Sequence, residues 1–407
     1  MKIPFSPPYI DESVKNEVMD SLNSGWITTG PKVKALEGEV MKLTGVKAAL
    51  GVNSWTSGTI MMLRWFGIGP DDEVVIPAYT YCATAMAVLW AGGKVVMVDS
   101  SDDFNISVEA IRKAITPNTK AIIPVDLAGF PCDYKAIMSL VKEPEIRAMF
   151  RPATPVQEKL GRILVLNDSA HSLGARFDGC SIGTDTDLTV FSLHAVKNIT
   201  TAEGGMVCFN MPAPFDNEQL YKEMRLMTLN CQTKDAFTKS QAGGWRYDIV
   251  GKGMKVNMAD INAAIGLAQI RQYDHLLAER RRIFNTYNEA FSKYDWAILP
   301  PCKSAEAESS YHAYALRIKG FTEQQRDKMI NEITRYEVAV NVHFVPLPML
   351  TYYKQLGFNI ADYPQAYKNY EHEISLPVYP QLDDEKVKFV IESVVKAYEA
   401  VANGTNA

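Results

Sequence analysis

The stretch FSLHAVKNITTAEGG, from Phe191 to Gly205, decides how the rest of the chain is interpreted. It continues an apolar run that begins at Leu188 and is predicted to be a buried strand. One lysine, Lys197, then stands among a serine, a histidine and two threonines, and a glycine pair precedes the next apolar run. In sheets of parallel strands, ligands bind beyond the carboxyl ends of the strands. We therefore expect a site where this strand ends.

Short apolar runs of the same kind recur on both sides of this stretch. They are AALGVN (48–53), EVVIPAY (73–79), KVVMVDS (94–100), KAIIPVD (120–126), RILVLND (162–168), LTVFSLH (188–194) and GGMVCFN (204–210). Helical patterns such as SVEAIRKAI (107–115) and DYKAIMSLV (133–141) lie between most of them. Strands that alternate with helices predict an α/β fold with a mostly parallel central sheet between helices.

The chain of 407 residues is long enough for one large and one smaller domain. We expect an amphipathic helix over 11–25 and a large domain over 1–260. A single long helix over 260–291 is expected to lead into a small C-terminal α/β domain over 261–407. Residues 142–161 extend no regular pattern, which suggests an inserted surface loop on the side opposite the site.

Composition excludes several classes of protein. A net charge of -5 argues against a nucleic-acid groove or a polybasic membrane contact. No apolar run approaches the ~18 residues of a membrane span, and the prolines and acids near the N-terminus do not suit a secretory signal. The six cysteines are scattered without a C-x-x-C pair, so we expect reduced thiols, a cytoplasmic location and no metal site.

Two strand ends in the first hundred residues carry polar or aromatic side chains. In GVNSWTSGT (51–59), hydroxyl side chains surround the start of a predicted helix, an arrangement that suits a phosphate group. Ordinary helix capping by Ser54 or Thr56 explains the same residues. In IPAYTYCAT (76–84), Tyr79 and Tyr81 end a strand, where they serve either to stack on a flat ring or to pack the sheet.

Two later strand ends carry ionisable side chains. Asp168 ends the apolar strand in LVLNDSAHSLGA (164–175), and burial of its carboxylate requires a cation or several donors. His171 follows it, and helix capping with a satisfied histidine is the alternative explanation. Lys197 is either a solvated loop lysine or an enclosed amine with a lowered pKa, which reacts with aldehydes.

Together these four strand ends describe one binding site. Pyridoxal 5'-phosphate (PLP) needs donors for its phosphate, a stacking face for its ring, a carboxylate at its pyridine nitrogen and a lysine that forms a Schiff base with its aldehyde. The sequence offers each of these at the end of a strand of one sheet. We therefore interpret Lys197 as the residue that carries PLP.

The motifs also resemble a known family. The segments SGWITTGPKVKALE (24–37), NDSAHSLGA (167–175), FSLHAVKNITTAEGG (191–205) and KVNMADINAAIG (255–266) resemble the DegT/DnrJ family of sugar aminotransferases, which are PLP enzymes of fold type I. The resemblance covers nearly the whole chain. It implies a fold type I PLP-dependent transferase that acts as a homodimer with shared active sites.

Carried over to this sequence, the resemblance implies a role for each matched residue. Lys197, Asp168 and His171 are the implied catalytic residues: the lysine binds the cofactor and moves protons, the aspartate binds the pyridine nitrogen, and the histidine lies by the 3-hydroxyl group. The other implied cofactor contacts are Tyr81 at the ring, Thr56, Ser57 and Ser192 at the phosphate, and Asn257 at the cofactor of the neighbouring subunit.

The substrate is less well defined by the sequence. The resemblance implies transfer of an amino group from glutamate to a nucleotide-linked 4-keto sugar for surface polysaccharide or glycan synthesis. A 3-keto substrate, or a PLP-binding regulator without turnover, is the alternative. Family members that act as 3-dehydratases have histidine in place of the lysine, so Lys197 favours transamination. Candidate substrate contacts are Trp26, Thr28, Arg246, His312 and His343, for each of which a structural role is equally open. Trp55 stands where relatives have a small residue.

Overall fold

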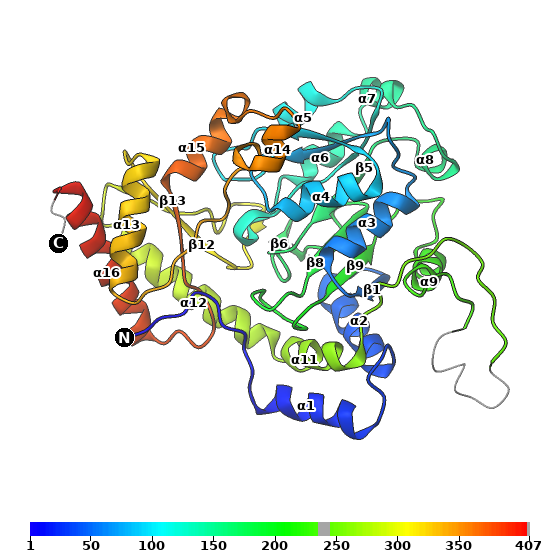
Figure 1. The fold of residues 1–407 in the computed structure, drawn as a ribbon, viewed down its shortest axis with the longest axis horizontal. Coiled ribbons are helices and arrows are strands. Elements are labelled where there is room, and N and C mark those ends of the chain that lie inside the picture. The colour runs from blue at the N-terminus through cyan, green and yellow to red at the C-terminus, as the bar shows by residue number, and fades with distance from the viewer. Residues whose placement is uncertain (235–244, 405–407) are drawn as a thin grey trace.

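A computed structural model describes residues 1–234 and 245–404 of the chain. Its centre is a seven-stranded sheet with the strand order β1-β9-β8-β5-β4-β2-β3 (Figure 1). The strands of this sheet are β1 (Ala48–Val52), β2 (Glu73–Pro77), β3 (Lys94–Val98), β4 (Thr119–Ile122), β5 (Leu164–Asp168), β8 (Leu188–Ser192) and β9 (Gly205–Phe209). Each apolar run in the sequence therefore forms a strand, as predicted.

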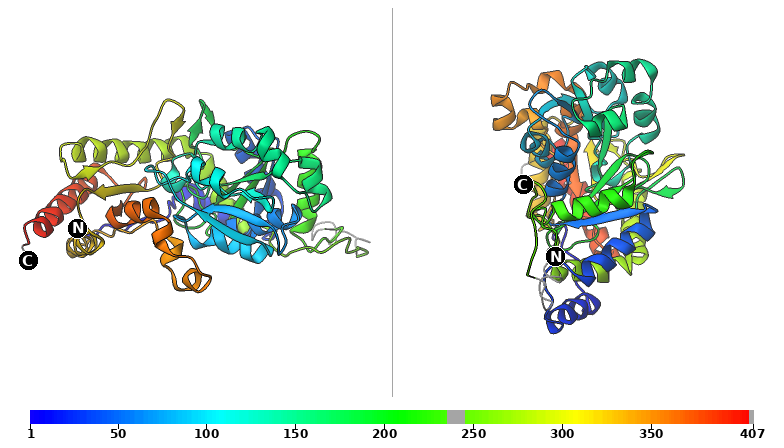
Figure 2. Two further views of the ribbon diagram at one scale, coloured as in Figure 1. Left: turned by 90° about the horizontal axis from the view of Figure 1, so that it is seen from above. Right: turned by 90° about the vertical axis from the view of Figure 1, so that its right-hand side faces the viewer.

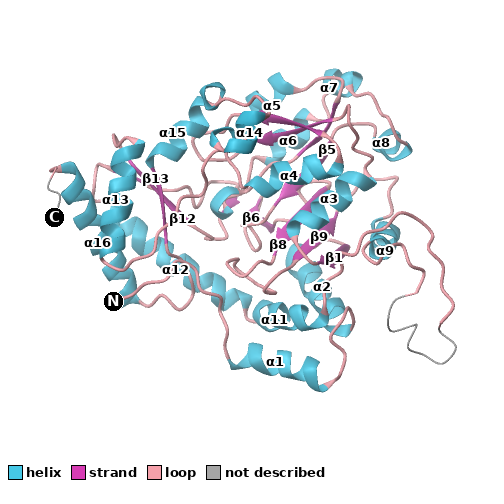
Figure 3. Cartoon of the chain, viewed as in Figure 1, coloured by secondary structure: helices cyan, strands magenta, loops and turns pink. Residues whose placement is uncertain are grey.

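Helices enclose this sheet, as Figure 3 shows. Those that precede the C-terminal part are α1 (Glu12–Asn23), α2 (Pro31–Thr44), α3 (Trp55–Trp65), α4 (Cys82–Ala91), α5 (Val108–Ala114), α6 (Tyr134–Leu140), α7 (Pro144–Met149), α8 (Pro155–Leu160) and α9 (Asn217–Met227). Helix α3 packs on β8 and β9, whereas α4 packs on β2 and β3. Within the described ranges, none of the helices has the length and apolar character that a bilayer crossing requires.

The strand directions confirm the expected mostly parallel sheet, with one strand as the exception. Strands β3, β2, β4, β5 and β8 run parallel, but β9 is antiparallel to both of its neighbours, β8 and β1. The connection from β8 to β9 is the loop that holds Lys197, and it contains no crossover helix. Parallel neighbours need such a crossover, so a direct loop returns the chain in the opposite direction. Because β1 and β8 both oppose β9, β1 still runs in the common direction.

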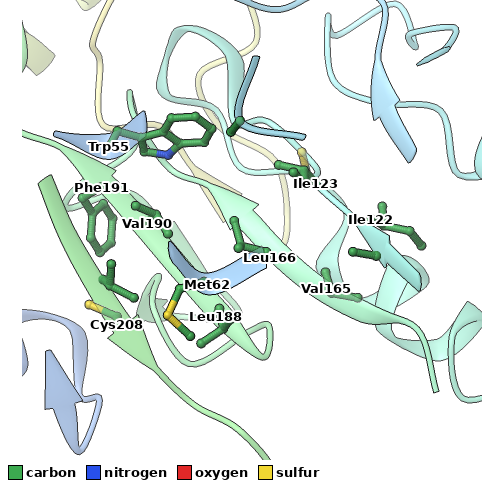
Figure 4. Packing of buried hydrophobic residues seen from close by; sticks show 14 of the residues in the cluster. Trp55, Met62, Ile122, Ile123, Val165, Leu166, Leu188, Val190, Phe191 and Cys208 are labelled. Atoms are coloured by element: carbon green, nitrogen blue, oxygen red, sulfur yellow. The ribbon is translucent and has the colours of Figure 1, made fainter. Parts of the chain in front are cut away.

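The interior of the sheet is almost entirely apolar. Strands β1, β4, β5 and β9 are buried along their whole length, which explains why their sequences read as continuous apolar runs instead of alternating ones. Figure 4 shows Leu166, Leu188 and Val190 packed in this core, with the Trp55 ring near the ends of the strands. Packing therefore fixes the strand ends and the residues that follow them.

The helix predicted over 260–291 is two helices. Helix α11 (Asp260–Ile270) ends before Gln272, whose backbone (φ -117°, ψ 18°) leaves the helical region, and α12 (Tyr273–Phe291) begins after it. Local contacts account for the break: the Gln269 carboxamide bonds Tyr9 and Thr200, and the Gln272 side chain reaches Asp11. The apolar period continues through the break, so the sequence pattern did not reveal it.

A second core surrounds α12 in the C-terminal part. This part contains a three-stranded antiparallel sheet of order β10-β12-β13, whose strands are β10 (Ala297–Ile298), β12 (Tyr314–Ile318) and β13 (Glu373–Leu376). Its helices are α13 (Glu323–Arg335), α14 (Thr351–Gln355), α15 (Pro364–His372) and α16 (Asp384–Ala402). The rings of Tyr287 and Tyr314 meet edge to face at 4.9 Å in this core. Figure 2 shows α13 and α16 at one end of the molecule and the large sheet at the other, whereas α14 packs on the large sheet's side, where Tyr353 donates to the Cys82 carbonyl. The boundary at residue 260 stays a prediction.

A third, small sheet of order β11-β6-β7 joins the two parts. Its strands are β6 (Arg176–Phe177), β7 (Cys180–Ser181) and β11 (Ala307–Glu308). Strand β11 pairs antiparallel with β6, so the chain just before β12 is tied to the segment that follows Asp168.

The expectation of a loop over 142–161 is wrong, because α7 and α8 lie there. Each helix starts with a proline at its first position, and the Thr154 side chain caps α8 by accepting from the Gln157 amide. Gln157 is fully buried and donates to the carbonyl of Phe66, beyond the C-terminal end of α3. The segment therefore packs at the end of α3 that is opposite the strand-end site.

Candidate active site

The carboxyl ends of β1, β2, β4, β5 and β8 lie at one edge of the large sheet, and a cavity of about 310 Å³ opens there. The residues that line it are Ser54, Trp55, Thr56, Thr80, Tyr81, Ala83, Thr84, Val125, Asp168, Ala170, His171, Ser192, His194, Val196, Lys197, Glu203, Gly204, His343 and Phe344. This set contains Lys197, Asp168, His171, Thr56, Tyr81, Ser192 and His343 from the sequence analysis. We call it the active-site cavity.

Asp168 ends β5 at the floor of this cavity. Its side chain accepts hydrogen bonds from the Thr84 hydroxyl (2.8 Å) and from the Ala170 amide (3.2 Å). Two donors do not compensate for the loss of water around a carboxylate that is only 4% exposed. Burial therefore raises the pKa of Asp168 to about 7. A cationic N–H group in the cavity would restore the missing donor.

A tightly bonded loop presents Lys197. The carbonyl of Leu193 accepts bonds from the Thr201 amide (2.8 Å) and from the Thr200 hydroxyl (3.1 Å), and Thr200 in turn accepts from the Ala202 amide (2.8 Å). These contacts close the loop at its base. The two threonines of the motif therefore fix the loop conformation, while Lys197 is left to face the cavity.

Lys197 and Asp168 influence each other across the cavity. Burial lowers the pKa of Lys197 to about 8, and the charge of Asp168 partly opposes that shift. The Lys197 charge in turn partly opposes the rise in the pKa of Asp168. An amine with a pKa near neutrality is a nucleophile under physiological conditions. The structure thus places a reactive amine and a buried carboxyl group around one space, as the sequence analysis proposed.

His171 is buried beside them with a defined hydrogen-bonding state. Its Nδ1 atom accepts a bond from the amide of Ala128 (3.2 Å), so the neutral ring carries its proton on Nε2. Burial, and to a lesser extent the Lys197 charge, lowers the pKa of His171 well below its usual value. The ring stacks on His312 at 4.3 Å. His171 therefore offers an N–H donor to a group in the cavity at neutral pH.

The start of α3 forms the opposite wall. The Ser54 side chain caps the helix and accepts from the Ser57 amide (3.0 Å), so the capping explanation for Ser54 is confirmed. Among the described residues, no acceptor bonds the amides of Trp55 and Thr56, which remain available to an anion. At Gly205, a side chain would lie 2.6 Å from the backbone of Ser54. The second glycine of the motif therefore lets β9 pass directly under this helix start.

Aromatic side chains form the mouth of the cavity. Tyr81 is 58% exposed, and its ring lies 5.5 Å from the ring of Phe344. Phe344 and His343 come from the C-terminal part of the chain, and the Phe344 ring also stacks on His171 at 5.9 Å. The cavity is therefore closed by residues from both ends of the sequence. The predicted stacking of Tyr81 on a ligand ring stays a prediction.

Several candidate residues lie outside the cavity. His312 stands behind His171, where its Nδ1 atom meets the Asn198 carboxamide at 2.9 Å. Asn257 donates to the Thr29 hydroxyl (2.6 Å) beside the end of β1. Four further candidates lie outside the lining. The Ser57 hydroxyl bonds that of Ser54, and the Trp26 indole donates to the Thr29 carbonyl. The Thr28 carbonyl accepts from the Asp260 amide, and the Arg246 guanidinium lies over the Trp245 ring.

Some cavity residues were not predicted. Thr84 is the most consequential, because it is the only side chain within the described ranges that donates to Asp168. It lies in the first turn of α4, within a segment that the sequence analysis quoted for its tyrosines. Phe344, His194 and Glu203 also line the cavity. Only the pairing of distant segments brings Phe344 there, so no local pattern indicates it.

The cavity fits PLP by the chemistry of its side chains. The under-satisfied carboxyl group of Asp168 suits a protonated pyridine nitrogen, and the His171 Nε2 proton suits the 3-hydroxyl oxygen. The free amides at the start of α3 suit the phosphate, and the Lys197 amine suits the aldehyde. All four groups line one cavity.

Comparisons with known proteins agree with this assignment. The model of the DegT/DnrJ/EryC1/StrS aminotransferase family matches residues 8–151 and 156–395. The spore coat polysaccharide biosynthesis protein SpsC of Bacillus subtilis is 33% identical over 400 residues, which are 96% of each chain.

Solved structures give the same result. Spr1654 of Streptococcus pneumoniae is named as a sugar aminotransferase. Its structure in the pyridoxamine phosphate (PMP) form matches with a TM-score of 0.94 and 42% identity, and the match covers 98% of this chain and 100% of Spr1654. PseC of Helicobacter pylori, an aminotransferase of pseudoaminic acid biosynthesis, matches with a TM-score of 0.86 and 28% identity, over the same shares. Spr1654 has also been solved in its PLP form. The chain belongs to the DegT/DnrJ/EryC1/StrS family of PLP-dependent sugar aminotransferases, with the fold type I architecture.

Proposed function

We propose that the protein transfers an amino group from glutamate to a nucleotide-linked 4-keto sugar that is used for surface polysaccharide or glycan synthesis. The observation that carries the aminotransferase chemistry is the pairing of the Lys197 amine with the buried Asp168 carboxyl group across one cavity. The sugar class is supported by the relatives SpsC and PseC, whose names assign them to polysaccharide and pseudoaminic acid biosynthesis. The motifs at 24–37 and 191–205 also resemble those of UDP-4-amino-4-deoxy-L-arabinose aminotransferase.

Each group of cavity residues has a separate role in this proposed reaction. Bound PLP supplies an electron sink for the bonds at the reacting carbon. Asp168 would keep a proton on the pyridine nitrogen, and His171 would donate from Nε2 to the 3-hydroxyl oxygen. Lys197 would hold the aldehyde carbon of bound PLP, and the lowered pKa of its amine would let Nζ take up and return a proton at the reacting carbon. The amides at the start of α3 hold the phosphate.

A homodimer with shared active sites completes the proposal. The exposed residues of the cavity lining are Tyr81, His194, Val196 and Glu203, and none of these is a lysine or an arginine that would bind a diphosphate group. Asn257, Trp26 and Thr28 lie together beside the end of β1, outside the cavity of their own chain. We propose that these residues serve the neighbouring subunit, with Asn257 at its cofactor phosphate.

The substrate proposal is tested by product analysis. The purified protein, loaded with PLP, is incubated with glutamate and a panel of nucleotide-linked 4-keto and 3-keto sugars. We expect an amino sugar only from a 4-keto substrate. Product from 3-keto sugars alone would replace the 4-keto assignment. A protein that binds PLP but forms no pyridoxamine phosphate from glutamate would be a regulator without turnover.

Replacing Thr84 by valine is expected to weaken PLP binding by roughly 10-fold. The Thr84 hydroxyl donates to Asp168, and a lost bond to a buried charged group costs about 1.5–3 kcal/mol. Without this donor the pKa of Asp168 rises further, so less carboxylate is present to bind the ring nitrogen. Equilibrium titration of the apoprotein with PLP, followed by absorbance, measures the change.

Thr59→Val is the matched control for this substitution. Thr59 is a fully buried threonine of α3, and its hydroxyl has no hydrogen-bond partner among the described residues. Valine at this position removes an unsatisfied donor and should leave PLP affinity unchanged. Equal affinities of Thr84→Val and Thr59→Val would show that the Thr84 hydroxyl does not support Asp168.

A further inference from the structure

A buried carboxyl group from the C-terminal sheet is linked to the active-site cavity by two hydrogen bonds. Glu373 and Ser375 alternate along β13 and therefore face the same side of the sheet. Both are fully buried. The Ser375 hydroxyl donates to Oε1 of Glu373 and lies 2.8 Å from Nδ1 of His343. His343 lines the active-site cavity, so the chain of contacts ends at the reacting groups.

Backbone contacts hold the three residues in register. The amide of Ser375 donates to Asn341 (2.8 Å), and the amide of Asn341 donates back to Ser375 (3.1 Å). The amide of His343 donates to Oε2 of Glu373 (3.0 Å). Each oxygen of the carboxyl group therefore has a different partner. One oxygen fixes the backbone at His343, and the other contacts the serine that reaches the ring.

The surroundings of the His343 imidazole disfavour its protonated, charged form. Burial and the nearby charge of Lys197 lower its pKa to about 3. The ring stacks on Phe5 at 5.5 Å and lies 6.3 Å from the ring of His171. Its Nε2 atom makes no hydrogen bond with the described residues, which leaves this atom for a group in the cavity. A base in this position must take up a proton without becoming an imidazolium.

We propose that Glu373, Ser375 and His343 form a proton relay through which His343 accepts a proton at Nε2 while it remains a neutral imidazole. A new N–H bond forms at Nε2 as the proton on Nδ1 passes to Ser375 Oγ. The former hydroxyl proton of Ser375 passes to Oε1 of Glu373, which becomes neutral. The cavity thus loses one proton, the carboxylate gains one, and the serine hydroxyl is regenerated.

The charged surroundings of Glu373 allow both of its protonation states. Burial raises the pKa of Glu373 to about 8, whereas its two donors and the charges of Arg326 and Arg317 act in the opposite direction. The groups that face this carboxyl group from the neighbouring elements are Arg317, Arg326, Tyr79 and His343, and those near the His343 ring are Lys197, His171 and His312. Glu373 therefore changes charge at mildly basic pH, near 8.

The relay deepens the proposed function, on which its catalytic meaning rests. An amino acid enters as an ammonium ion and must lose a proton before its nitrogen acts as a nucleophile. His343 Nε2 offers an acceptor for that proton, and the relay transfers the charge change to Glu373, away from Lys197. Glu373 and Ser375 do not line the active-site cavity, so they are positioning residues for His343.

The tautomer of His343 reports the relay directly. With Glu373 ionised, Ser375 donates to it and accepts from Nδ1–H, which leaves Nε2 unprotonated. With Glu373 protonated, both bonds reverse and the proton lies on Nε2. Nitrogen-15 NMR of histidine-labelled holoenzyme distinguishes the two tautomers, and the signal among the six histidines is assigned with His343→Asn. We expect the wild-type ring to change tautomer near pH 8, as Glu373 titrates.

Two variants separate the relay from a purely structural role. In Glu373→Gln, the amide of His343 keeps the glutamine oxygen at the Oε2 position, so the NH2 group faces Ser375 and the ring should carry its proton on Nε2 at every pH. In Ser375→Ala, the tautomer should no longer depend on pH in this range, and Ser375→Thr should restore the dependence. Ser393→Ala, at a buried serine that bonds Phe389 in α16, is the control and should keep the wild-type switch.

Kinetics supply the second readout. The glutamate half-reaction should slow by on the order of 10²-fold in Glu373→Gln and Ser375→Ala just above pH 8, where Glu373 of the wild type is ionised. The deficit should grow as Glu373 of the wild type ionises through pH 8, and it should shrink at still higher pH, where solution supplies the free amine. A wild-type ring that keeps one tautomer from pH 6 to 10, or a switch that survives Ser375→Ala, would overturn the relay. Failure of the wild-type enzyme to use glutamate would overturn the proposed function instead, because the tautomer measurement does not depend on turnover.

Discussion

Replacing Lys197 by alanine is expected to lower kcat by ~10³–10⁴-fold or more. A positioned acid–base group contributes roughly 10²–10⁴-fold to a rate, and Lys197 also supplies the covalent attachment of PLP. The loop around it is closed by Thr200 and Thr201, whose bonds do not involve the lysine side chain, so the variant should fold normally. Stopped-flow measurement of the glutamate half-reaction in wild type and variant gives the ratio.

A buried lysine away from the cavity provides the control for this loss. Lys120 is 3% exposed and bonds the carbonyl of Pro117 at the other end of the sheet, far from the strand ends that line the cavity. Lys120→Met should lower thermal stability and leave kcat near the wild-type value. In Lys197→Ala, a small primary amine such as methylamine should restore part of the rate, because the deleted side chain leaves space in the cavity. A variant that turns over sugar at the wild-type rate would remove Lys197 from the mechanism.

Replacing Asp168 by asparagine is expected to reduce turnover by on the order of 10²–10³-fold while it stabilises the apoprotein. Loss of the charge that faces the ring nitrogen removes electrostatic stabilisation of the kind that one well-placed group provides. In the apoprotein, however, the same carboxylate is buried with only two donors. The neutral amide of the variant does not carry that desolvation cost.

The pH dependence of stability distinguishes this explanation from a simple packing effect. The pKa of Asp168 is raised to about 7 in the folded apoprotein, so the folded state binds a proton more tightly than the unfolded state. The resulting destabilisation is complete above pH 7 and fades as the pH falls toward 4. The free energy of unfolding of wild type should therefore approach that of Asp168→Asn at low pH and fall below it by a few kcal/mol at pH 8. A gap that is constant with pH would contradict the assigned burial cost.

The large sheet was predictable because its strands are buried on both faces. Runs such as LVLND and LTVFS are continuous in apolar character, and each ends where the chain leaves the core. The same reasoning located Asp168 and Lys197, since a polar residue directly after a buried strand lies at the strand end. The direction of β9 and the break between α11 and α12 depend on a missing crossover and on side-chain contacts of Gln269 and Gln272, which periodicity does not record.

The walls of the cavity were less predictable than its floor. Thr84 contacts Asp168 across 84 positions of sequence, and Phe344 reaches the cavity from the C-terminal part. His312 illustrates another case, since it stacks on His171 from behind, while its contact with substrate stays a prediction. A single sequence shows that a side chain has useful chemistry, but the distant partner that orients it becomes visible only in the folded chain.

The attachment point of the cofactor tests the assignment of the site most directly. The PLP-loaded protein is reduced with borohydride, digested and mapped by mass spectrometry, which identifies the lysine that carries the pyridoxyl group. We expect the modification on the peptide that contains Lys197, with none on Lys120 or on the other lysines. A pyridoxyl group on a different lysine, or PLP that is released unreduced from the native protein, would contradict the assignment of this cavity as the catalytic site.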